Sequence, residues 1–72
     1  MIYLISSEQG NKVAVLRSWG EKVTQTHSPS GHWTWCVGRE MPRVLAWARE
    51  HGLKWQVFVS DTAWESLTEG VK

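Results

Sequence analysis

The chain of 72 residues has one cysteine, two prolines and no apolar run near the roughly 20 residues that a membrane span requires. Because Cys36 is single, no disulfide within the chain stabilises the fold. The first ten residues lack the basic start and apolar run of a signal peptide, so we expect a cytoplasmic location. One domain, residues 1–72, is all that this length accommodates, and its core has to hold without covalent help.

The sequence also lacks an excess of charge of either sign. Eight Lys and Arg balance seven Asp and Glu, for a net charge of +1. A nucleic-acid reader usually carries a basic stripe, and an acidic mimic would carry the opposite excess. The charge balance therefore indicates neither.

The sequence lacks the residue sets that catalysis and metal binding require. A metal site needs three or four His, Cys, Asp or Glu ligands. His27 and His32 bracket one loop, but Cys36 would lie about 13 Å from His32 along a strand. Cys36 itself stands between two apolar residues, as a buried and inert thiol does. We expect no metal, no cofactor and no enzymatic activity.

Two apolar runs near the N-terminus predict a β-hairpin. Residues 1–6 and 12–19 are rich in β-branched and aromatic side chains, with Gly10 in a turn signal between them. Residues 21–27 have weaker strand character. The Ser-Pro-Ser-Gly sequence of residues 28–31 then predicts a loop.

Two further runs alternate in polarity and predict strands over residues 32–38 and 54–60. Between them, residues 42–51 predict the one long helix, with Pro42 in its first turn and Gly52 as its C-terminal cap. A strand, helix and strand of this length are typical of a right-handed crossover, which would make the two strands parallel.

The predicted core joins this helix to one face of the sheet. Apolar residues at helical spacing form the buried stripe of the helix: Met41, Val44, Leu45 and Ala48. The alternating strands supply the facing side chains: Trp33, Trp35, Val37, Trp55, Val57 and Val59.

A short second helix is predicted after residue 60. Thr62 and Glu65 have the spacing of a capping box, Gly70 is placed to end the helix, and Trp64 and Leu67 are spaced to dock it. The sequence as a whole predicts an α+β fold. A small mixed sheet of three to five strands carries the main helix on one face and a short C-terminal helix.

Tryptophan is unusually frequent, with six residues in 72 against one Phe and one Tyr. One helix covers few such side chains, so some are expected at the surface. Arg43, Trp47 and His51 are spaced four residues apart at the edge of the helix stripe. Arg and Trp are common hot spots of protein interfaces. These residues, with Trp19, predict a non-catalytic module of adaptor or inhibitor type that binds a protein partner.

Two further hypotheses concern partners. Single-stranded nucleic acid is the alternative, because Arg17, Trp19, Lys54 and Trp55 interleave cations with aromatic rings as stacking platforms do. Self-association into a two-fold homodimer is also expected. Residues 1–6 carry no charged side chain and would form a strand at an unprotected sheet edge. No motif assigns the chain to a family, and its size and composition are typical of small bacterial and phage proteins.

Overall fold

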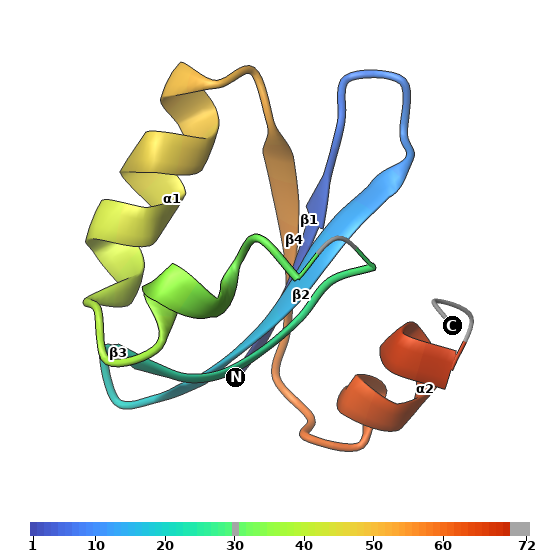
Figure 1. Ribbon diagram of the computed structural model, residues 1–72. Helices are drawn as coiled ribbons and strands as arrows, with labels where there is room; N and C mark the ends of the chain where they lie inside the picture. Colours follow the sequence, from blue (N-terminus) through green and yellow to red (C-terminus); the bar gives the residue numbers. More distant parts are fainter. Residues whose placement is uncertain (30, 70–72) are drawn as a thin grey trace.

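A four-stranded antiparallel sheet forms the centre of the computed structural model, which describes residues 1–29 and 31–69. The strand order is β3-β2-β1-β4 (Figure 1). The elements are β1 (Ile2–Ser6), β2 (Lys12–Trp19), β3 (Lys22–His27), the 3-10 turn η1 (Thr34–Cys36), α1 (Met41–Glu50), β4 (Lys54–Phe58) and α2 (Ala63–Glu69). The predicted α+β class, N-terminal hairpin, main helix and short C-terminal helix are confirmed.

The hairpin of β1 and β2 aligns the apolar side chains that pack in the core with α1. Tyr3 lies opposite Leu16, and Ile5 lies opposite Ala14. A bulge in β2 follows, and it brings Val13 as well as Ala14 against the core under α1. The weak strand predicted at residues 21–27 is present as β3 and pairs with β2.

Helix α1 ends in the cap that its sequence predicts. Gly52 has a φ of +74°, a conformation that a residue without Cβ adopts without strain. The Gly52 N–H donates to the carbonyl of Arg49, and the Leu53 N–H donates to the carbonyl of Ala48. This pair of hydrogen bonds defines the Schellman motif and turns the chain directly into β4.

The two helices lie on opposite faces of the sheet (Figure 1). The main core joins one face to α1 and η1 through nine buried residues: Ile5, Ala14, Leu16, Val23, Trp33, Cys36, Met41, Val44 and Ala48. Alternation along the strands places Ile2 and Val15 on the other face, where α2 contacts β1 and β2. There the Arg17 guanidinium lies 4.9 Å from the centroid of the Trp64 ring. None of the helices in the described part of the chain is long and apolar enough to cross a membrane.

The prediction of a strand over residues 32–38 is wrong. This segment contains the turn η1, in which the N–H of Cys36 donates to the carbonyl of Trp33. The buried residues are Trp33 and Cys36, three apart, rather than every second residue. Tertiary packing overrides the β propensity of the segment, because the turn buries both side chains in the main core beside β3.

The predicted parallel strand pair is therefore also wrong. All pairings in the sheet are antiparallel, and α1 connects the edge strand β3 to the edge strand β4. Residues 1–6, expected at an edge, form the central strand β1, which pairs with β2 on one side and β4 on the other.

The helix side of the predicted core is confirmed, since Met41, Val44 and Ala48 are buried and Leu45 packs against them. Of the six facing residues, Trp33 is buried and Trp55 is half-buried. The other four are exposed, which contradicts the prediction: Trp35, Val37, Val57 and Val59. Ser30 of the predicted loop and Gly70, expected to end α2, lie outside the described residues.

Candidate binding surface

Four aromatic rings meet at one place, from η1, α1 and one capping residue of each, and we call this group the tryptophan cluster: Trp33, Trp35, Trp47 and His51. The ring of Trp33 stacks on that of Trp35 with centroids 6.4 Å apart. Trp47 meets both edge-on, at 5.3 Å from Trp33 and 5.1 Å from Trp35. Edge-to-face and offset stacked contacts are the favoured geometries of aromatic pairs. The rings therefore hold one another in fixed orientations.

His51 completes the cluster at the C-terminal end of α1. Its ring stacks on Trp47 with centroids 4.1 Å apart. Its Nδ1 lies 2.8 Å from the carbonyl oxygen of Trp47, and because a carbonyl only accepts, Nδ1 carries the hydrogen and donates. The same carbonyl accepts the backbone N–H of His51. Helix capping thus fixes the imidazole flat against the indole.

Exposure increases across the tryptophan cluster from the core outward. Trp33 is 6% exposed and belongs to the main core, whereas Trp35 is 41% exposed. Trp47 is half-buried, and His51 is exposed. Arg43 is exposed one turn before Trp47 on α1, so its cation is on the same side of the helix. A rigid apolar surface with a cation beside it reaches solvent here.

Trp19, the fourth residue predicted for protein binding, lies apart from the tryptophan cluster. It is 83% exposed at the end of β2, where it pairs with Lys22. The side chain of Ser18 is buried beside Val23 of the main core, so alternation directs Trp19 to the opposite face. The structure brings Trp47 and His51 together and leaves Trp19 elsewhere.

The residues of the nucleic-acid alternative are divided between the two faces. Arg17 lies on the face of α2, where its guanidinium covers Trp64 and donates from Nη1 to Oε1 of Gln25 at 3.1 Å. Trp55 packs against the main core on the face of α1. Lys54, next to Trp55 on β4, is exposed. These side chains form no common stacking platform.

Cys36 is fully buried, as expected, although in η1 rather than in a strand. Burial raises the pKa of its thiol from 9.0 to about 11, against the opposing effect of the positive charge of Arg39. The thiol is therefore protonated at neutral pH and is a poor nucleophile. Over the described ranges, no group of three or more His, Cys, Asp or Glu side chains comes together as metal ligands would.

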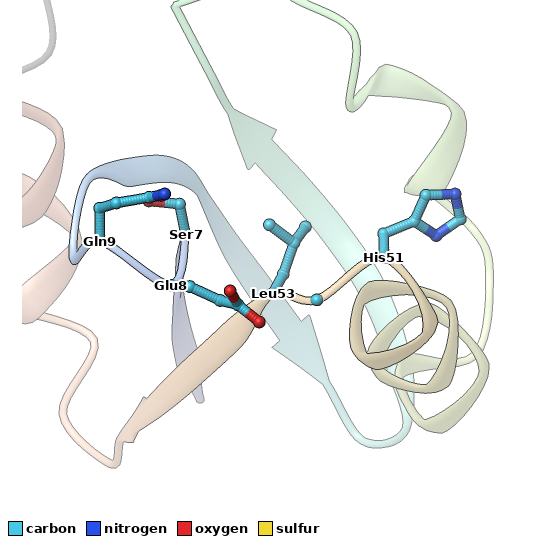
Figure 2. Close-up of a pocket in the computed structure, with 6 residues that line it drawn as sticks. Ser7, Glu8, Gln9, His51 and Leu53 are labelled. Atoms are coloured by element: carbon cyan, nitrogen blue, oxygen red, sulfur yellow. The ribbon is translucent and has the colours of Figure 1, made fainter.

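An open depression of about 250 Å³ lies between the β1–β2 turn and the end of α1. Figure 2 shows the Glu8 carboxylate reaching toward Leu53, while the ring of His51 turns away from it. The polar groups do not converge on one point, so the depression lacks the arrangement that a small-molecule site requires.

Sequence reasoning found Trp47 and His51 but missed that Trp33 and Trp35 join them. The spacing of Trp33 and Cys36, three residues apart, carries the signal for a helical turn and was outweighed by the alternation of Trp33, Trp35 and Val37.

Comparison with the models of known families, with curated proteins and with solved structures gives no match.

Proposed function

We propose that this protein is a non-catalytic binding module whose contact with a protein partner is centred on the tryptophan cluster. The observation that carries the proposal is the exposed ring of Trp35, held by the buried Trp33 and by Trp47. A side chain that is already ordered loses little conformational entropy on binding, so its burial contributes more to affinity.

The neighbouring residues support the same site. Arg43 places a cation beside the aromatic surface, and His51 places an exposed polar ring at its other end. Aromatic side chains with Arg at their margin are the composition in which interface hot spots are enriched. We infer a partner that buries an apolar side chain against Trp35 and Trp47 and sets an acidic group near Arg43.

Affinity capture from the host cytosol tests the proposal. Tagged wild-type protein and the variants Trp35→Ala and Trp19→Ala are compared by quantitative mass spectrometry. Both substitutions remove an exposed indole, but only Trp35 belongs to the tryptophan cluster. Proteins retained by the wild type and by Trp19→Ala, and lost with Trp35→Ala, support the proposal. Equal retention by all three contradicts it.

Titration with single-stranded oligonucleotides distinguishes the alternative class of partner. Tryptophan fluorescence is followed at low and high salt, with Arg17→Gln as the variant that removes the cation. Quenching that weakens with salt and with this variant would replace the protein-binding proposal, because phosphate contacts release counterions. No response at either salt concentration is the result that the proposal predicts.

A further inference from the structure

We infer that the chain forms a two-fold dimer in which β4 pairs antiparallel with β4 of a second copy, so that two four-stranded sheets become one continuous sheet. The inference is independent of the function proposed above. It uses the backbone edge of β4, whereas the proposed function uses the aromatic rings at η1 and on α1, a helix that itself contacts β4.

The two edges of the sheet differ in their backbone hydrogen bonds to the rest of the chain. The segment that follows η1 covers the start of the β3 edge: the N–H of Val23 donates to the carbonyl of Arg39, and the Val23 carbonyl accepts the N–H of Gly38. Glu40 forms a further bridge to Lys22. Among the described residues, no backbone hydrogen bond outside the sheet ladder involves Lys54–Phe58. The first part of the β3 edge is therefore covered, whereas the β4 edge presents unpaired N–H and C=O groups to an incoming strand.

The β4 edge also has few of the features that discourage pairing. Lys54 at the start of β4 is its one charged residue, and residues 55–59 contain no charge, proline or glycine. Val57 is 41% exposed, and Val59 just beyond the strand is exposed as well. Natural edges are usually protected by charge, by proline or by a covering segment. A second copy provides the cover that this chain does not.

The sequence of β4 is complementary to itself in one register. A two-fold axis at Gln56 pairs all five residues of the strand, whereas an axis at Trp55 or Val57 pairs only three. In the register centred on Gln56, Trp55 lies opposite Val57 of the second copy, an aromatic and β-branched pair of the kind that stabilises sheets. Lys54 lies opposite Phe58 of the second copy, so no like charges meet. In this register, odd-numbered residues of one copy pair with odd-numbered residues of the other. The backbone N–H and C=O groups that point away from β1 therefore face their counterparts in the second copy.

Sedimentation equilibrium over a range of protein concentrations measures the dimer directly. The wild type is expected at twice the chain mass, and Val57→Lys is expected at the mass of one chain, because two added charges would enter the pairing. Val37→Lys is the matched control, since Val37 is 49% exposed but lies outside the sheet. A wild type that stays monomeric at high concentration overturns the inference, as does a Val37→Lys effect equal to that of Val57→Lys.

Disulfide trapping tests the register. A Gln56→Cys variant places two thiols opposite each other on the two-fold axis, within reach of a cross-link. The native Cys36 is buried and stays unreactive. Gln25→Cys, at an exposed position on β3, is the control for collision. Mild oxidation is expected to give covalent dimers of the Gln56→Cys variant at least ten times faster than of the control. Equal rates for the two variants overturn the inference.

Discussion

At the scale of single residues, exposure divides the tryptophans into structural and surface roles. Trp33 is buried against the main core, whereas its stacking partner Trp35 leaves two-fifths of its surface in solvent. Both rings belong to one cluster, so their substitution separates the contribution of core burial from that of aromatic contact. A surface function is available to Trp35 because Trp33 already supplies the core volume.

Trp33→Ala is expected to cost about 3–5 kcal/mol, the range for removing a well-packed large aromatic side chain. Trp35→Ala is expected to cost less, about 1–3 kcal/mol, because its ring is 41% exposed and loses two aromatic contacts. Urea denaturation of the two variants checks the difference. Equal losses, or a larger loss for Trp35→Ala, would contradict the placement of these rings.

The Cys36 thiol makes stability depend on alkaline pH. Because its pKa is raised from 9.0 to about 11 in the folded chain, its stabilising contribution is complete below pH 9 and is lost as pH rises toward 11. The unfolded thiol deprotonates first, which favours unfolding in that interval. The free energy of unfolding is measured at pH 8 to 11 for wild type and Cys36→Ala, whose difference isolates the thiol from other titrating groups. A difference that does not change across this interval would show that the thiol pKa is not raised by folding.

At the scale of elements, the ends of the helices are set by local sequence, and their docking is set by contacts across the sheet. Helix α1 was predictable because its apolar stripe, Pro42 and Gly52 all lie within one short segment. The turn η1 was not, because its conformation depends on residues 38–40, which cover β3 by bonding to Val23. The alternation of Trp33, Trp35 and Val37 describes a strand equally well when those distant bonds are unknown.

Gly52→Ala is expected to destabilise the protein by about 1–2 kcal/mol, because alanine at a φ of +74° is strained. The space beside Gly52 is sufficient for a methyl group, which would contact the Glu8 carboxylate at an ordinary 3.5 Å. The cost is therefore conformational. Gly52→Asn, which tolerates this conformation better, serves as the control, and thermal denaturation is the measurement. Equal stability of the alanine variant and the wild type would contradict the capping role.

Helix α2 is held on its face of the sheet by Trp64. Its ring lies under the Arg17 guanidinium and meets the ring of His27 edge-on at 6.4 Å. Trp64→Ala is expected to release α2, with a loss of about 1–3 kcal/mol from apolar burial and the cation–π contact. Hydrogen exchange by NMR should show faster exchange in Ala63–Glu69 and no change in Met41–Glu50. Equal acceleration in both helices would mean that α2 and α1 share one cooperative core.

At the scale of the whole molecule, the fold class followed from the order of the elements, but the sheet topology did not. Strand pairing joins residues far apart in sequence, such as Tyr3 with Val57, and periodicity contains no information on such partners. The same limit affects the site. Trp47 and His51 are four residues apart at the end of α1 and were predicted together, whereas Trp35 meets Trp47 only through the tertiary packing of η1.

We propose that the tryptophan cluster, and not exposed tryptophan in general, binds the partner. The dissociation constant of the captured partner protein tests it most directly, measured by titration calorimetry for wild type, Trp35→Ala and Trp19→Ala. A hot-spot truncation costs about 2 kcal/mol or more, so Trp35→Ala should weaken binding about 30-fold while Trp19→Ala stays within about two-fold of wild type. Equal weakening by both substitutions, or a larger effect of Trp19→Ala, would contradict binding through the tryptophan cluster.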